Sequence, residues 1–160
     1  MDPLTALSVA GTIIQFVQFG GQILKGSRQF YESASGALSV NEELEIITRD
    51  LSDLLFKLER PLGPNNPPDS PVKDAEYRGL EDICAHCRKV ANELLTRLNG
   101  LKIRGKHQAW KSLQHAIKAA WAQREVDELD KRLVGFRRSL ETHIISSLRQ
   151  VTSPRLILRF

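Results

Sequence analysis

Polar residues recur every three or four positions through the otherwise apolar start of the chain. This polar seam consists of Thr5, Ser8, Thr12, Gln15, Gln18, Gln22, Lys25, Gln29 and Glu32. Steps of three and four place residues on one side of a helix. Because the remaining arc is wide and apolar, the pattern predicts a helix over residues 4–33 that is covered on most sides by other helices or by lipid.

The apolar arc contains the candidate membrane-active residues, which are Leu4, Leu7, Gly11, Ile13, Ile14, Phe16, Val17, Phe19, Gly20, Gly21, Ile23 and Leu24. The glycines would ease bending or close helix packing. Only Asp2 is charged before Lys25, so the run is long enough to cross a bilayer, although its glutamines suit a permanent span poorly. A secretory signal has Lys or Arg before its apolar segment, whereas this chain has Asp2 there, so a cleaved signal is not favoured. A central core helix is the alternative, and a buried helix that inserts after a trigger combines both.

The rest of the chain shows helical periodicity at 40–59, 74–99, 106–121 and 123–150, with residues 151–160 as a tail that holds the one strand-like run, 156–160. Ser39 and Glu42 fit a capping box. Prolines at 61, 64, 67, 68 and 71 predict a loop, and Asn99-Gly100 predicts the end of the third helix. The sequence therefore predicts an all-α, antiparallel bundle of four or five helices, depending on whether the turn near Ala122 is a break or a bend.

Composition fits one globular domain, over residues 1–150, because 41% of the 160 residues are hydrophobic and 26% are charged. A net charge of +4 permits binding to anionic surfaces without establishing it. The densest basic region is a candidate anionic-surface patch made of Lys102, Arg104, Lys106, Lys111, Lys118 and Arg124. An ordinary solvated helix face is the alternative, and nucleic acid is not favoured because no aromatic residues alternate with these charges on an exposed face.

Cys84 and Cys87 are too close in sequence for a disulfide framework, which favours a reducing, cytoplasmic setting. A zinc site would need two more ligands from His107, His115 and His143, which are scattered, so packed core cysteines are predicted and no metal.

Trp110 and Trp121 are eleven residues apart, which places them on nearly one helical side, where they would pack against the final helix or anchor at a membrane interface. The run 20–27 has glycines and a lysine in the wrong order for a phosphate loop. No catalytic set is recognisable, so the sequence predicts no enzyme activity, no cofactor and no small-molecule substrate.

Several segments together resemble a known family. They are Met1 to Ala10, Phe16 to Gly20, Tyr31 to Gly36, Arg49 to Leu51, Lys106 to Trp110 and Leu129 to Leu133. Over residues 1–150 the chain resembles the N-terminal helical domains of fungal NACHT NTPases and ankyrin-type, NLR-like receptors, among the HeLo-like and related fungal domains. No nucleotide-binding module follows within the printed sequence, which leaves open whether the chain stands alone or belongs to a larger receptor.

The resemblance implies a non-enzymatic signalling domain of fungal nonself recognition or programmed cell death. In some members the N-terminal helix is thought to insert into membrane, a role that would fall on residues 4–24 here. We expect a cytoplasmic effector that becomes membrane-associated on activation. The alternative is an interaction or oligomerisation scaffold with protein partners, including other copies of itself, and no membrane activity.

Overall fold

The computed structural model describes residues 3–25, 39–59, 71–105 and 112–152, and they form five helices. These are α1 (Pro3–Lys25), α2 (Val40–Glu59), α3 (Pro71–Gly105), α4 (Leu113–Ala120) and α5 (Gln123–Thr152). No strand occurs within these ranges. The predicted all-α class is confirmed, and the turn at Ala122 is a break, which makes five helices rather than four.

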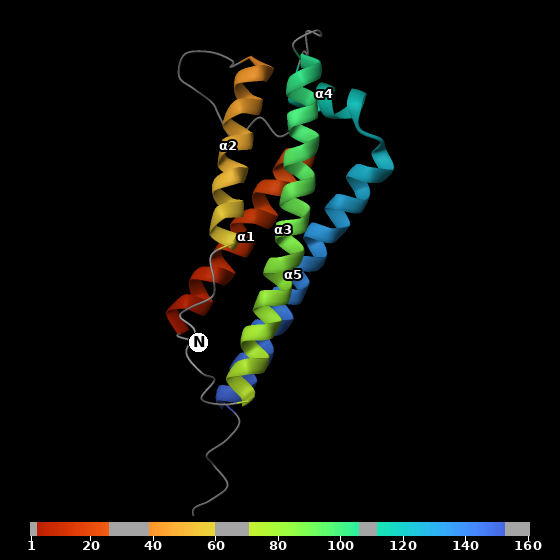
Figure 1. Cartoon of the computed structure of the whole chain (residues 1–160). Coiled ribbons are helices and arrows are strands. Elements are labelled where there is room, and N and C mark those ends of the chain that lie inside the picture. Colours follow the sequence, from red (N-terminus) through yellow and green to blue (C-terminus); the bar gives the residue numbers. More distant parts are fainter. Residues whose placement is uncertain (1–2, 26–38, 60–70, 106–111, 153–160) are drawn as a thin grey trace, which may run out of the picture.

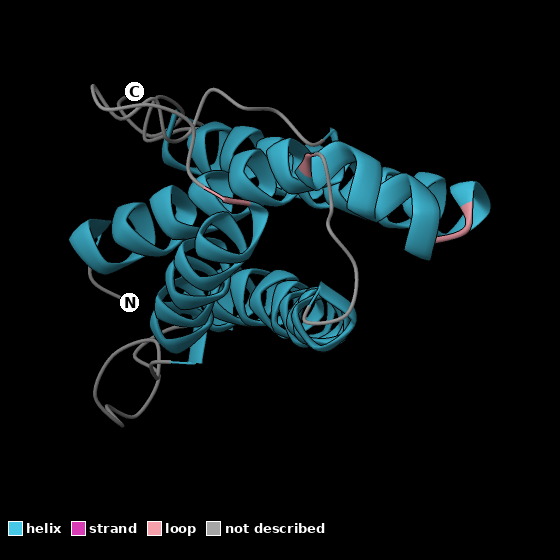
Figure 2. Ribbon diagram, turned by 90° about the horizontal axis from the view of Figure 1, so that it is seen from above, coloured by secondary structure: helices cyan, strands magenta, loops and turns pink. Residues whose placement is uncertain are grey.

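The four long helices alternate in direction along the bundle. In Figure 1, α1 and α3 run upward and α2 and α5 run downward, while the short α4 crosses near the top. The view from above in Figure 2 shows the long helices gathered around a common interior. α1 contacts each of the other four helices, and α2 and α5 lie on different sides of α1 and α3. α3 also contacts each of the other four helices, so α1 and α3 together form the centre of the bundle.

One continuous hydrophobic core joins all five helices. α1 contributes Ile13 and Phe16, α2 contributes Leu44 and Leu51, and α3 contributes the longest stripe, from Leu80 to Leu101. The stripe of α5 (Leu129, Leu133 and Leu140) closes the core from the opposite side. These positions follow the three- and four-residue periodicity that identified the helices in the sequence.

The start of α2 confirms the capping box. The Ser39 backbone N–H donates to Glu42 Oε2 at 2.9 Å, and the Glu42 N–H donates to Ser39 Oγ at 3.3 Å. Two backbone donors that a helix leaves unpaired are thereby satisfied.

α3 is longer at both ends than the predicted 74–99. It begins at Pro71, because a proline needs no hydrogen-bond partner for its nitrogen in the first helical turn. The predicted end at Asn99-Gly100 is wrong, and the helix continues to Gly105. Leu98 and Leu101 lie on the same buried stripe, so core packing outweighs the local preference of Asn-Gly for a helix end.

The predicted helix over 106–121 is also corrected. Ser112 is extended, with φ −159° and ψ 162°, and its Oγ accepts the His115 N–H at 3.1 Å, so α4 begins only at Leu113. α4 ends at Ala120, and Trp121, which caps it, is extended as well. α5 runs two residues past the expected 150. The expected continuation of the first helix over 26–33 and the strand-like run 156–160 lie outside the described residues.

Candidate functional site

The candidate membrane-active helix is packed unequally around its circumference. Ile13 and Phe16 are fully buried, and Ile23 and Leu24 are at most 8% exposed. Val17 and Phe19 are half-buried against the core, while Leu4 lies in the first turn. Leu7 is 70% exposed and Ile14 is 43% exposed. The second half of α1 is therefore a core helix, whereas its first half leaves two large apolar side chains at the surface.

Only one glycine of α1 is at a close helix contact. A Cβ added to Gly20 would lie 3.0 Å from Leu133 Cδ1 of α5 and 3.7 Å from Leu94 Cδ1 of α3. A Cβ added to Gly11 or Gly21 would meet nothing within 4 Å. The sequence suggested one role for all of these glycines, but in the structure they differ. Of the three in α1, only Gly20 lies where the lack of a side chain allows close packing against neighbouring helices.

By length and composition alone, the segment Thr5–Lys25 is apolar enough to cross a membrane. About a third of it is buried inside the bundle. The core helix of a globular domain has the same composition, since both environments exclude charge. Hydropathy alone therefore does not distinguish a membrane span from a core helix, and the packing of α1 has to be considered as well.

The predicted basic patch does not form one continuous cationic surface among its described members. Lys102 turns toward α2 and pairs with Glu45, its Nζ lying 3.2 Å from Oε1. Arg124 pairs with Glu128 one turn further along α5 at 3.4 Å. Arg104 and Lys118 are exposed, on α3 and α4. Lys106 and Lys111 lie outside the described residues.

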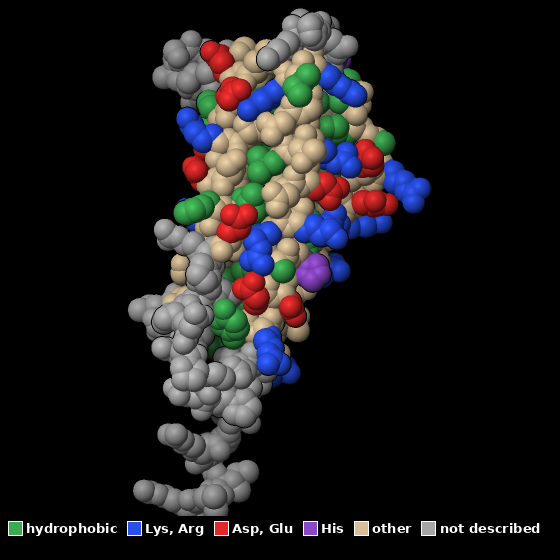
Figure 3. All heavy atoms as spheres, viewed as in Figure 1, with side chains coloured by type: hydrophobic (Ala, Val, Ile, Leu, Met, Phe, Trp, Pro, Cys, Tyr) green, Lys and Arg blue, Asp and Glu red, His purple; other side chains and the backbone are tan. Residues whose placement is uncertain are grey.

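Figure 3 shows positive and negative side chains interspersed over one face of the bundle. Ordinary solvated faces have this mixture, because neighbouring charges of opposite sign offset one another. The described part of the basic region therefore fits the solvated-face alternative better than a lipid-binding patch.

An ion-pair network joins α3 to the start of α5. Arg97 Nη1 donates to Glu125 Oε2 at 2.9 Å, and Arg132 Nη1 donates to Glu93 Oε2 at 2.8 Å. Arg97 also lies 3.6 Å from Glu93, which links the two pairs. The hydrogen bond between Arg97 and Glu125 lowers the pKa of the Glu125 carboxyl, and the same hydrogen bond raises the pKa of Arg97. This network links α3 to the first three turns of α5 at the surface of the bundle.

Trp121 is a packed core residue between α4 and α5. It is 7% exposed, and the guanidinium of Arg97 lies 5.9 Å from the centroid of its ring. A cation at this distance over an indole is attracted to the ring face. The side chain thus meets Arg97 of α3, and its burial in the core fits the predicted packing role better than a membrane anchor. Trp110 lies outside the described residues.

The burial of both cysteines is confirmed. Cys84 is 2% exposed and Cys87 is 0% exposed, and neither forms a disulfide. Burial raises the pKa of Cys84 to about 11 and that of Cys87 to about 12. Thiols with such values are protonated at neutral pH and react slowly.

Two of the three histidines considered for zinc are within the described residues. His115 is exposed on α4, and the ring of His143 on α5 fills the space beside Gly79, where an added Cβ would lie 2.7 Å from Nδ1. His107 lies outside the described residues. Among the residues that the structure describes, no group of three or more His, Cys, Asp or Glu side chains is placed to hold a metal ion.

Two exposed helix faces were not singled out in the sequence. Each has an apolar side chain between two charges of one sign: Asp53, Phe56 and Glu59 on α2, and Lys131, Val134 and Arg138 on α5. We call these sets the α2 face and the α5 face. The sequence signal for such a face is two like charges with an apolar residue between them, at spacings of three or four. Residues with these spacings lie on the same side of a helix.

Comparison with known proteins adds no assignment, since no protein-family model, curated protein or solved structure matches the chain.

Proposed function

We propose that this chain is a non-enzymatic protein-interaction module of a signalling protein, with α1 as its permanent central helix. The observation that carries the proposal is that Ile13 and Phe16 of α1 are fully buried in the core shared by all five helices. The proposed setting is cytoplasmic, and the resemblance to fungal NACHT-associated domains supports a role in nonself recognition or cell-death signalling. The proposed partners are proteins.

The burial of α1 makes its release expensive. Burying a large apolar side chain contributes about 1.5–3 kcal/mol, so Ile13, Phe16, Ile23 and Leu24 together contribute about 6–12 kcal/mol. A whole domain is usually stable by only about 5–15 kcal/mol. Removing α1 from the bundle would therefore approach the free energy of unfolding the domain, which favours a scaffold over a helix that leaves and returns.

Exposed apolar side chains support an interaction role. Besides Leu7 on α1, Phe56 on α2 is 61% exposed, Ile103 on α3 is 66% exposed and Leu148 on α5 is 59% exposed. They lie on four different helices, so they support the interaction role as separate contacts, each of which would gain free energy if a partner covered it.

A membrane effector is the second candidate, and the uncharged length of Thr5–Lys25 is the observation that favours it. In this version a trigger releases α1, and insertion into lipid replaces the burial that the bundle gives up.

Deletion of residues 1–22 separates the two candidates. The scaffold proposal expects the remaining chain to lose its cooperative unfolding transition and its fixed tertiary structure, measured by near-ultraviolet circular dichroism. A remainder that stays folded would contradict the scaffold and support the effector. Leakage of dye from anionic liposomes, caused by the intact chain under forced self-association, would support the effector as well.

A further inference from the structure

The α2 face and the α5 face have opposite charge and the same order along the chain. Asp53, Phe56 and Glu59 follow one another at steps of three residues, which spans about 9 Å of helix. Lys131, Val134 and Arg138 span about 10.5 Å. Each face thus presents two like charges, about the same distance apart, with an apolar side chain between them.

The four charges are available for a partner. Asp53, Glu59, Lys131 and Arg138 are exposed, and within the described ranges no ion pair or hydrogen bond engages them. Lys57 also lies on α2, but it is turned about 100° around the helix from Phe56. Opposite charges lie on the same helix sides one turn beyond each face, at Arg49 on α2 and at Asp127 and Glu141 on α5, and each of these has a neighbour within its own helix.

The apolar side chains between these charges are also accessible. Phe56 is 61% exposed and Val134 is 42% exposed. An aromatic side chain that meets an aliphatic one across an interface buries surface from water, which adds a non-electrostatic contribution to the charge attraction.

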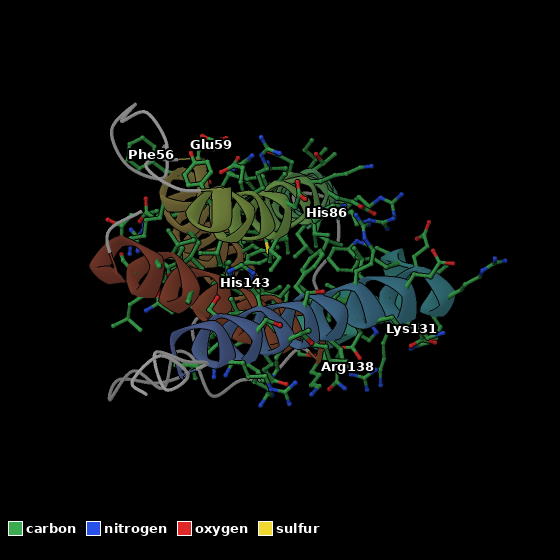
Figure 4. The ribbon with its side chains drawn as sticks, turned by 90° about the horizontal axis from the view of Figure 1, so that it is seen from below. Phe56, Glu59, His86, Lys131, Arg138 and His143 are labelled. Carbon is green, nitrogen blue, oxygen red and sulfur yellow. The ribbon has the colours of Figure 1, made fainter. Side chains whose placement is uncertain are left out.

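The two faces point to opposite sides of the same level of the bundle. Figure 4 shows Phe56 and Glu59 on one side of the molecule and Lys131 and Arg138 on the other. Arg88 of α3 donates to the carbonyl of Leu58 in α2 at 2.9 Å, which places the α2 face near residue 88 of α3.

The α5 face lies at almost the same level, because the ring of His86, also on α3, is 6.4 Å from the ring of Phe136 on α5. Two residues separate His86 from Arg88, so the two faces differ in height by about one helical turn or less, or about 5 Å.

α2 and α5 also run in the same direction through the bundle (Figure 1). A copy of the molecule moved sideways, without rotation, would therefore bring its α2 alongside the α5 of its neighbour, with both helices running in the same general direction. In that arrangement Phe56 would meet Val134, and the long side chains of Lys131 and Arg138 would reach toward the carboxylates that flank Phe56.

The geometry points to head-to-tail self-association, in which the α2 face of one molecule binds the α5 face of the next. This inference rests on the proposed interaction function and names its partner as a second copy of this chain. Because the two faces are different and lie on opposite sides, each molecule keeps one free face, and the contact repeats into an open linear assembly rather than a closed dimer.

The contact is small and polar, so we expect it to be weak between single molecules and sensitive to salt. Exposed ion pairs contribute little each, and a net charge of +4 opposes assembly at low ionic strength. Recruitment of several copies to one site would strengthen it through effective concentration.

Two charge-reversal variants test the contact. Lys131→Glu with Arg138→Glu makes both faces acidic, and Asp53→Lys with Glu59→Lys makes both faces basic. Sedimentation velocity of the full chain over a wide concentration range, at about 0.01 M and about 1 M salt, measures association. We expect the original chain to associate with increasing concentration and each variant to associate at least tenfold more weakly.

Mixing the two variants is the decisive arm. An all-acidic and an all-basic molecule are complementary at both faces, so the mixture should regain association while neither variant associates alone. The control matched to Lys131→Glu with Arg138→Glu is Arg78→Glu with Lys89→Glu, which makes the same change in net charge at exposed positions of α3 and should associate like the original chain. Circular dichroism verifies that every variant is folded.

Three results would overturn the inference. One is a chain that stays monomeric at every concentration. Another is association that the face variants leave unchanged or that the α3 control weakens equally. The third is a monomeric chain whose Lys131 and Arg138 are needed for binding to anionic vesicles, since the α5 face would then dock on lipid. None of these results refutes the proposed interaction function, which the deletion of residues 1–22 tests separately.

Discussion

Substitution of Phe16 by alanine measures how firmly α1 is held in the bundle. The Phe16 side chain is fully buried and lies in the common core, on the half of α1 that packs inside the bundle. Truncation leaves a cavity that the surrounding helices fill only in part. Leu7, which is 70% exposed on the same helix, provides the matched control.

The expected loss is large relative to the total. Replacing a buried phenylalanine by alanine lowers the free energy of unfolding by about 3–5 kcal/mol. In a domain of this size that corresponds to a fall of about 6–20 °C in Tm. Leu7→Ala should change the free energy of unfolding by no more than about 0.5 kcal/mol, because it removes little buried surface.

Chemical denaturation followed by far-ultraviolet circular dichroism gives both values, with the denaturant slope checked for constancy. If Phe16→Ala is no more destabilising than Leu7→Ala, α1 does not contribute to the core in the way described, and the scaffold proposal loses its basis.

Three further outcomes are expected from denaturation midpoints. Gly21→Ala should raise the free energy of unfolding by about 0.5–1 kcal/mol through helix propensity. Gly20→Ala should give a value about 1–3 kcal/mol lower than Gly21→Ala, because the added Cβ crowds Leu133 of α5. Equal effects of the two substitutions would refute the close approach of α1 to α5 at Gly20. Burial raises the pKa values of Cys84 and Cys87 in the folded chain, so above about pH 9 the unfolded chain loses these protons first. The free energy of unfolding should therefore fall from about pH 9 toward pH 11, and it should fall by less in a variant with both cysteines replaced by alanine. An identical fall in the original chain and the variant would contradict the burial of the thiols. Arg88→Ala should cost about 1.5–3 kcal/mol, because Arg88 donates a charged hydrogen bond to the last turn of α2; a neutral result would show that this bond is not formed.

The sequence identifies the start of a helix well where a side chain forms a hydrogen bond with the backbone of a residue a few positions away. The capping box at Ser39 is such a case, since Glu42 is only three residues away and no distant contact is needed. Helix ends at Asn-Gly are less secure. The signal at Asn99 is outweighed because ending α3 there would remove Leu101 from the core.

The contacts between helices were not predictable, because each depends on how distant segments align. Nothing near Arg97 in the sequence indicates that it will bond Glu125 and lie over Trp121. The same holds for Lys102, which the sequence grouped with a cationic patch and the structure pairs with Glu45 of α2. Pattern arguments place a residue on a helix side, whereas its partner is decided by the packing of the whole bundle.

The α1 helix illustrates both outcomes. Its periodicity correctly predicted a polar seam and a buried arc, but the pattern could not separate Leu7 from Phe16, because both are large, apolar and on the wide side of the helix. The structure separates them, since the neighbouring helices cover only part of that side.

Native-state hydrogen exchange of the α1 backbone amides tests the central role of this helix most directly. If α1 is the permanent centre of the bundle, the amides of residues 16–24 should exchange only through global unfolding, with the same opening free energy as those of the buried stripe of α3. Amides of α1 that exchange through an opening several kcal/mol lower than the α3 amides would show that α1 leaves the folded bundle on its own, and would contradict the account.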